Sequence, residues 1–140
     1  MAKPSTGNLP VPAALTRGVT LQVIDYNEVE LILTAGSDGI AQDETDQLQQ
    51  NQYMRIERIV VTTSSQNTVE VTIYQGDNPI PQRGRDWTIL PPGYVAVSEY
   101  PSFLTILPTY CLMAQVTGAN EGDTFCVVAT YQLVQKLTNR

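Results

Sequence analysis

Short runs in which apolar and polar residues alternate recur along this chain at spacings of roughly ten residues. Alternation with a period of two is typical of β-strands that turn one face toward a core. Proline, glycine and asparagine separate the runs, and no stretch shows helical periodicity over a useful length. About eight or nine short strands with frequent turns predict an all-β fold: a single β-sandwich of the jelly-roll type, formed by residues 18–140.

The last third of the chain contains the strongest hairpin pattern, two β-rich runs on either side of a polar segment with two glycines. If Thr117 pairs with Thr124, one face is continuously apolar, with pairs Leu112 and Ala129, Ala114 and Val127, Val116 and Phe125. The other face carries Cys111, Met113 and Val128, which is less polar than a solvated surface requires. We expect the N-terminal arm or a neighbouring subunit to cover that face.

A second hairpin is predicted from residues 54–63 and 69–74. It would place Val71 opposite Val61 and Ile73 opposite Ile59. The alternation breaks near Arg58, which predicts a β-bulge there.

The remaining segments predict shorter elements. Residues 19–23 and 29–34 predict an opening hairpin, and residues 35–52 a long surface loop with one short helical turn at 44–49. Pro79 and Pro81 lack the amide that a ladder needs, so residues 75–87 predict a surface excursion rather than a central strand. Further short strands are expected at 87–90, 94–98 and 102–107.

Residues 1–17 precede these runs and contain three prolines among serine, threonine, glycine and asparagine. Such a composition forms neither a helix nor a paired strand. We expect an extended N-terminal arm that orders against a neighbouring subunit, and a disordered terminus is the alternative.

Charge and residue types exclude several classes of function. Eight Lys and Arg against fourteen Asp and Glu give a formal charge of −6 without a basic cluster, so nucleic-acid binding is not expected. No apolar run is long enough to cross a bilayer, and the start lacks the apolar core of a signal peptide, so no membrane partner is expected. Histidine is absent, which removes the commonest general base and zinc ligand. We therefore expect no enzyme activity, no cofactor and no metal site. The two cysteines are expected to be buried free thiols, because free cysteine is among the most buried residue types.

Three weaker patterns leave alternatives open. Tyr74, Trp87 and Tyr94 could stack on sugar rings, which would make the protein a carbohydrate-binding receptor-recognition module of a phage tail. In the other interpretation these aromatic side chains pack on the core or at a subunit contact. Arg83 and Arg85 could anchor a protein interface or be solvated. A hydrolase that works with carboxylates alone would draw on Asp77, Asp86 and Glu99.

Across residues 60–133 the order of features resembles small β-sandwich virion proteins of tailed bacteriophages, such as capsid decoration (cement) proteins and other minor head or tail proteins. The matching segments are ValValThr at 60–62, TyrGlnGlyAsp at 74–77, ArgAspTrpThr at 85–88, ProProGly at 91–93 and ThrGlyAla at 117–119. The resemblance implies a structural virion protein, assembled in the host cytoplasm, that forms a homo-oligomer such as a trimer and binds other virion proteins in a capsid or tail lattice. It transfers no site residues.

Overall fold

The computed structural model describes residues 19–138, which form eight β-strands. The expected N-terminal arm, residues 1–17, lies outside the described residues. The strands are β1 (Val19–Thr34), β2 (Ala41–Glu44), β3 (Gln52–Thr63), β4 (Val69–Asp77), β5 (Ile80–Leu90), β6 (Ala96–Ile106), β7 (Cys111–Thr117) and β8 (Thr124–Thr138). No helix in this part of the chain has the length and hydrophobicity needed to span a bilayer.

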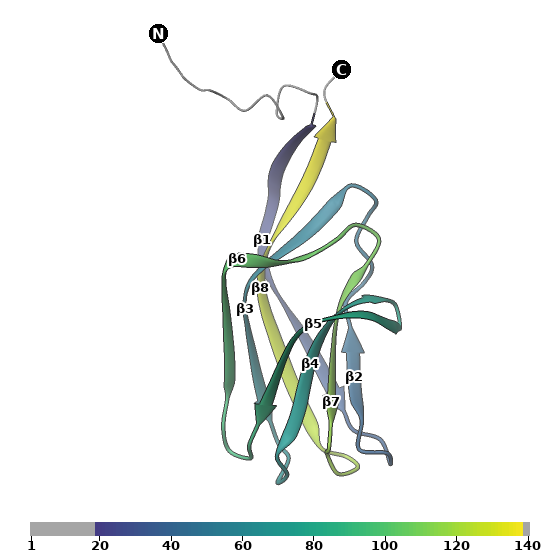
Figure 1. Ribbon diagram of the computed structural model, residues 1–140, viewed down its shortest axis with the longest axis vertical. Helices are drawn as coiled ribbons and strands as arrows, with labels where there is room; N and C mark the ends of the chain where they lie inside the picture. The colour runs from purple at the N-terminus through teal and green to yellow at the C-terminus, as the bar shows by residue number, and fades with distance from the viewer. Residues whose placement is uncertain (1–18, 139–140) are drawn as a thin grey trace.

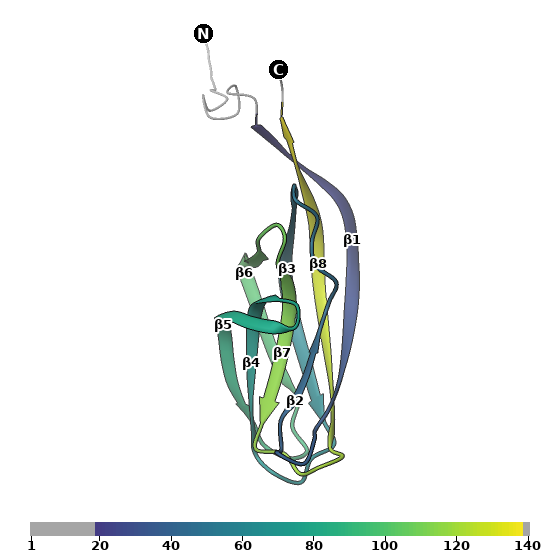
Figure 2. The same ribbon diagram turned by 90° about the vertical axis from the view of Figure 1, so that its right-hand side faces the viewer.

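The strands build two antiparallel four-stranded sheets that face each other (Figures 1 and 2). The first sheet has the order β1-β8-β3-β6 and the second the order β2-β7-β4-β5. The pairing is nested, because β1 pairs with β8, β2 with β7, β3 with β6 and β4 with β5. One long antiparallel ribbon is thus rolled up until β8 also meets β3 and β7 also meets β4. This is a jelly roll, as the sequence predicts.

The core lies between the sheets and is filled by the inward-facing residue of each alternating pair. Its largest completely buried side chains include Leu33, Ile56, Ile59, Leu90, Ile106, Leu112 and Phe125. The alternation in the sequence therefore identifies correctly which side chains are inside.

Both predicted hairpins are wrong, because each pair of strands is divided between the two sheets. Thr117 pairs with Glu70, and Thr124 pairs with Thr34. The segments 64–68 and 118–123 are arches that cross from one sheet to the other. An arch buries the same alternate side chains as a hairpin, so the pattern alone cannot separate the two.

The valines expected to pair within the hairpins have exchanged partners. Val71 pairs with Val116 in the second sheet, and Val61 pairs with Val127 in the first. The pairing of Phe125 is with Leu33 and Thr63 rather than with Val116.

The opening of the chain also differs from the expectation. Residues 19–34 form one continuous strand, β1, in which the register shifts between Val23 and Asp25, instead of a hairpin. The expected surface loop contains β2, and residues 45–49 form no helical turn. The reason is tertiary: the short run after Ala41 completes the edge of the second sheet by pairing with β7.

The predicted β-bulge near Arg58 is confirmed, since the register of β3 shifts between Ile56 and Arg58 against both neighbours. The segment with Pro79 and Pro81 forms the tip of the β4–β5 hairpin. The surface excursion expected at 75–87 is wrong, because most of these residues pair in β4 and β5, and the strand expected at 87–90 begins at Ile80. Because β5 is an edge strand, proline costs no ladder bond there. The two short strands expected at 94–98 and 102–107 are one strand, β6, that passes through Pro101.

Candidate functional site

Cys111 and Met113 lie on the outer side of β7, yet both are completely buried. The tip of the β4–β5 hairpin bends across β7 (Figures 1 and 2). Backbone groups of Gly76 and Asn78 lie against the Cys111 thiol, and Gly76 lies against Met113. A Cβ built on Gly76 would lie 3.0 Å from Met113 Cε. The burial of Cys111 raises the pKa of its thiol. The cover expected from an arm or a subunit is therefore supplied by the chain's own hairpin tip, and neither side chain presents a surface to a partner.

Two side-chain contacts fasten this hairpin tip to the neighbouring β2 and the segment after it. Gln42 Nε2 donates to the carbonyl oxygen of Pro79 at 3.0 Å, and Gln47 Nε2 donates to Asp77 Oδ1 at 2.7 Å. The tip is thus bonded at more than one place as well as packed on Met113.

Val128 lies on β8, in the first sheet, so it does not share a face with Cys111 and Met113. It is half-buried on the outer side of that sheet. On the same side, the Sγ atom of Cys126 donates to Glu30 Oε2 at 3.2 Å. Both cysteines are free thiols, Cys111 buried and Cys126 partly so.

The two candidate interface arginines, Arg83 and Arg85, have different surroundings. Arg83 is exposed near the hairpin tip. Arg85 Nη1 donates to the carbonyl oxygen of Thr105 at 2.6 Å, and burial lowers the pKa of its guanidinium. Together with the hydrogen bond from Tyr100 Oη to Asp86 Oδ2 at 2.6 Å, this contact ties β5 to β6 across the open side of the sandwich. Arg85 therefore makes a contact within the fold, between one sheet and the other.

The carboxylates considered for a hydrolase lie apart in the fold. Asp77 is bonded at the hairpin tip, Asp86 accepts from Tyr100, and Glu99 lines a hollow on the first sheet. The geometry therefore does not assemble these three groups into one site.

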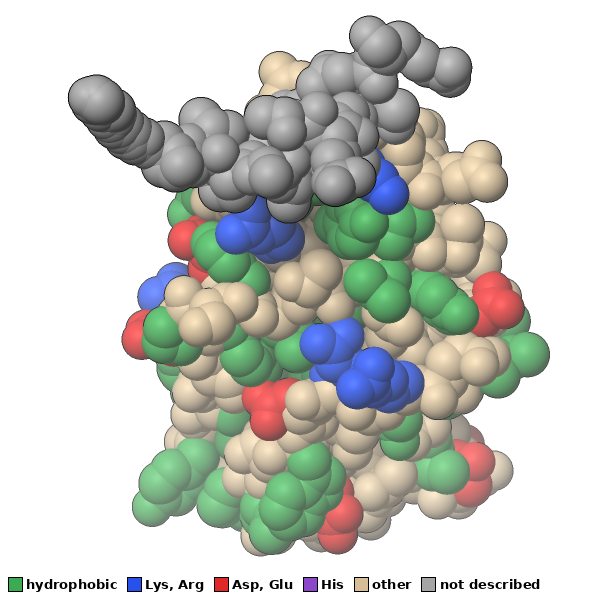
Figure 3. All heavy atoms as spheres, turned by 45° about the horizontal axis from the view of Figure 1, so that its top comes forward, with side chains coloured by type: hydrophobic (Ala, Val, Ile, Leu, Met, Phe, Trp, Pro, Cys, Tyr) green, Lys and Arg blue, Asp and Glu red, His purple; other side chains and the backbone are tan. Residues whose placement is uncertain are grey.

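Of the candidate sugar-stacking residues, Tyr74 and Trp87 lie on the outer face of the second sheet, and Tyr94 lies in the loop after β5. Thr72 pairs with both Trp87 and Gln115, so an aromatic, a hydroxyl and an amide form one row. Trp87 is 56% exposed, and its Nε1 donates to Glu70 Oε1 at 3.2 Å. On the surface shown in Figure 3, hydrophobic side chains are scattered among polar ones, and charged side chains are few.

The edge strand β1 carries apolar side chains into solvent. Leu21 is 55% exposed, Val23 50%, Ile24 40% and Ile32 53%. Pairing between β3 and β8 ends at Gln135, so the start of β1 and the end of β8 form a two-stranded ribbon that projects beyond the sandwich (Figures 1 and 2).

Among the described residues, side chains cap the backbone amides of the lower part of the β1 edge, from Tyr26 onward, but not those of its upper part. Asp43 Oδ2 accepts from Ile32 N at 3.1 Å, Asn27 Oδ1 from Glu28 N at 2.8 Å, and Asp25 Oδ1 from Tyr26 N at 2.9 Å. Between residues 21 and 24 the described part of the chain supplies no such cap. An uncapped strand edge with apolar side chains is a template for pairing with another strand.

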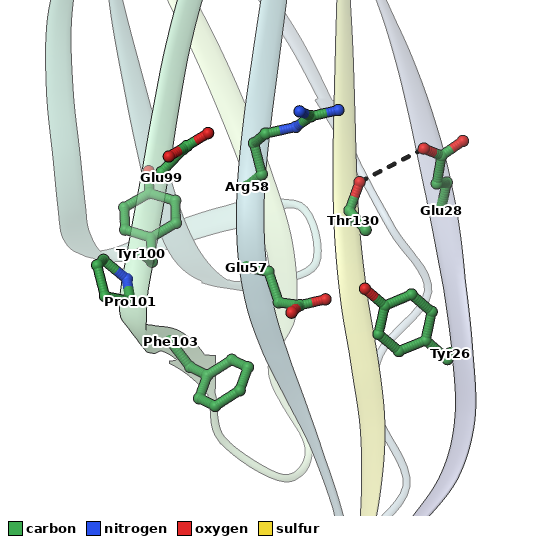
Figure 4. Close-up of a pocket in the computed structure, with 9 residues that line it drawn as sticks. All are labelled: Tyr26, Glu28, Glu57, Arg58, Glu99, Tyr100, Pro101, Phe103 and Thr130. Atoms are coloured by element: carbon green, nitrogen blue, oxygen red, sulfur yellow. Dashed lines mark hydrogen bonds between the residues drawn. The ribbon is translucent and has the colours of Figure 1, made fainter.

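A hollow of about 460 Å³ lies on the outer face of the first sheet (Figure 4). The strand register sets Glu28, Thr130, Arg58 and Glu99 in one row across β1, β8, β3 and β6. The bulge in β3 adds Glu57 beside this row. The wall is completed by Tyr26, Tyr100, Pro101 and Phe103.

Glu57 is the unusual group in this hollow, because its Oε2 atom is buried without a hydrogen-bond partner. The Tyr26 hydroxyl points toward this carboxylate (Figure 4), and its interaction with Glu57 raises the pKa of Tyr26. Across the hollow, Phe103 has a left-handed backbone with φ of 64°, and the Arg55 guanidinium lies 4.1 Å from its ring centroid.

Neither the β1 edge nor the hollow was identified from the sequence. The apolar residues of the edge look like those of an ordinary strand until the sheet order shows that β1 is outermost. The residues of the hollow come from four strands spread over the chain, and only the register of the sheet brings them into a row.

No protein-family model and no curated protein matches this chain. Among solved structures, a chain of the disulfide-linked pili of Bacillus endospore appendages is 16% identical, with a TM-score of 0.47 over 94% of this chain and 100% of that one. A chain of the virus-like particle of extra small virus from the prawn Macrobrachium rosenbergii is 14% identical, with a TM-score of 0.45 over 96% of this chain and 87% of that one. A family 29 carbohydrate-binding module is 11% identical, with a TM-score of 0.34 over 85% and 92%. At these values the likenesses carry no argument about function.

Proposed function

We propose that this protein is a structural subunit that self-associates through the open edge of β1. The observation that carries this proposal is the combination, at residues 21–24 of β1, of exposed apolar side chains and a backbone edge that no described residue caps. A second copy that pairs its own β1 antiparallel to this one would continue the first sheet across a two-fold axis. The backbone would supply affinity and the apolar side chains would gain burial.

A contact of this size is weak when it acts alone. Each new backbone hydrogen bond contributes about 0.5–1.5 kcal/mol, and only a few can form between residues 19 and 24. Repetition in a lattice multiplies such weak contacts, which suits a component of a large assembly better than a free enzyme. The sequence resemblance to tailed-phage virion proteins supports a capsid decoration protein as the form of this function. A trimer or other small ring and a capsid or tail lattice as partner stay predictions.

The test is light scattering of the wild type and of two matched variants over a range of concentrations. Val23→Lys places a charge on the open edge, whereas Val95→Lys makes the same change at a loop valine that is equally exposed, 56% against 50%. We expect the wild type and Val95→Lys to self-associate and Val23→Lys to be shifted to monomer. A wild type that stays monomeric throughout, or two variants that behave alike, would contradict the proposal.

A carbohydrate-binding function is the second candidate, supported by the row of Trp87, Thr72 and Gln115 on the outer face of the second sheet. An exposed indole beside amide and hydroxyl groups can stack on a sugar ring and bond its hydroxyls. A glycan array probed with wild type and Trp87→Ala tests it. Binding that is lost in the variant would support this function, and an array without signal for the wild type would remove it.

A further inference from the structure

The hollow on the outer face of the first sheet contains more negative than positive charge. Among the described residues, Glu28, Glu57 and Glu99 line it together with one cation, Arg58. Among the described residues, no three carboxylate, thiol or imidazole groups are arranged to hold a metal ion. The three carboxylates come from β1, β3 and β6 around the hollow, which suits an organic cation with several N–H donors.

Glu57 supplies a second, independent reason to expect a cationic ligand. Its Oε2 atom is buried and has no hydrogen-bond partner among the described residues, a state that native proteins rarely leave uncompensated. Tyr26, which faces this carboxylate, is 61% exposed, so its ring can move without disturbing the core. A ligand that brings N–H donors between Tyr26 and Glu57 would satisfy the buried oxygen.

The aromatic walls indicate which kind of cation fits. Tyr26 and Phe103 lie on opposite sides of the Glu57 carboxylate (Figure 4). The ring of Phe103 already contacts one guanidinium, that of Arg55, at 4.1 Å. A guanidinium is planar, so it can stack on an aromatic ring while its fork of N–H groups bonds a carboxylate, which an ammonium group cannot do in the same way.

We propose that this hollow binds the guanidinium group of an arginine side chain presented by a protein partner. Glu57 and Glu28 accept its hydrogen bonds, and the ring of Tyr26 stacks on its plane. The hollow opens on an exposed sheet face, where a side chain of another protein can enter. Its β1 residues, Tyr26 and Glu28, follow the uncapped residues 21–24 along the same strand, and the two proposals rest on different side chains.

The test is a calorimetric or NMR titration of the full chain with N-acetyl-arginine amide, which represents an arginine within a protein. N-acetyl-citrulline amide has nearly the same shape without the charge and serves as the ligand control. We expect the arginine probe to bind, the citrulline probe not to bind, and Glu57→Gln to weaken binding by about tenfold, as loss of a charge-assisted hydrogen bond would. Glu121→Gln removes an exposed carboxylate between β7 and β8 and should change nothing.

Glu28→Gln provides a second variant on the rim, with the fold of each variant checked by circular dichroism. The proposal is overturned if the arginine probe does not bind, if both probes bind equally, or if both Glu57→Gln and Glu28→Gln bind like the wild type. Light scattering of the same samples separates the two proposals. Arginine binding by a strict monomer would refute only self-association, and self-association without arginine binding would refute only this site.

Discussion

The packing of the hairpin tip on Met113 can be tested by a double-mutant cycle between Gly76 and Met113. Met113 is completely buried, so Met113→Ala should lower the free energy of unfolding by about 2–5 kcal/mol, the usual result of leaving a cavity. In Gly76→Ala, the new Cβ would lie 3.0 Å from Met113 Cε, 3.3 Å from Met113 Cβ and 3.3 Å from the carbonyl oxygen of Ile80. Overpacking of this kind costs about 1–3 kcal/mol.

The double variant should be less destabilised than the sum of the single variants. Truncation of Met113 removes the Cε contact, the tightest that the new methyl group on Gly76 would make. We expect a coupling energy of about 1 kcal/mol between the two positions. The assay is urea unfolding followed by far-UV circular dichroism, with the free energies extrapolated to water.

Gly84 offers the matched control, because a Cβ there would meet nothing closer than 3.7 Å. Gly84→Ala should change the free energy of unfolding by less than about 0.5 kcal/mol and should add to Met113→Ala without coupling. If Gly76→Ala and Met113→Ala add within about 0.5 kcal/mol, the tip is not packed on Met113 and the reasoning is refuted.

Three further predictions concern the faces and edges of the sandwich. Met113→Glu should prevent folding because it buries a charge, whereas Val128→Glu changes a half-buried outer position and should still fold. Circular dichroism measures both, and equal loss of structure would contradict the placement of the two residues on different sheets. Arg85→Met should lower the free energy of unfolding in urea by about 1 kcal/mol, because the carbonyl oxygen of Thr105 loses its donor; an unchanged value would show that this contact between the sheets is not needed. Burial, followed by the hydrogen bond to Asp86, raises the pKa of Tyr100 above 10.0 in the folded protein. The contribution of Tyr100 to the free energy of unfolding is therefore complete below pH 10.0 and is lost as the pH rises further. Tyr100→Phe should reduce this loss in urea unfolding at high pH, and an unchanged pH profile would contradict the prediction.

The period of two in the sequence is enough to predict the fold class and much of the core. It places residues such as Ile59, Val71 and Val116 on inward faces, and it detects the bulge near Arg58 as a break in the alternation. These properties depend on local geometry, because successive side chains of a strand point to opposite faces whatever the strand is paired with.

The pairing of strands could not be predicted in this way. Residues 117 and 124 are close in sequence, so a hairpin is the shortest connection, yet the segment between them crosses to the other sheet. The alternation records burial and is the same for an arch and a hairpin, while the choice between them depends on contacts with β1, β3 and β4 far away in the chain.

The same limit applies to the surfaces. The burial of Met113 depends on the hairpin tip that crosses it, and the exposure of Val23 depends on the place of β1 at the sheet edge. Neither can be seen from the residues themselves. The hydrophobic back of β7 and the apolar start of β1 look alike in the sequence, although the described residues cover the first and leave the second exposed.

Hydrogen exchange measured by mass spectrometry, at a low and at a high protein concentration, tests the central claim most directly. If β1 pairs with a second copy, backbone amides of residues 19–24 should exchange more slowly at high concentration, because the new sheet takes up amides that face solvent in the single chain. The other edge strands, β2, β5 and β6, should exchange at the same rate under both conditions. Unchanged exchange in β1, or protection that appears at another edge instead, would contradict the proposed assembly.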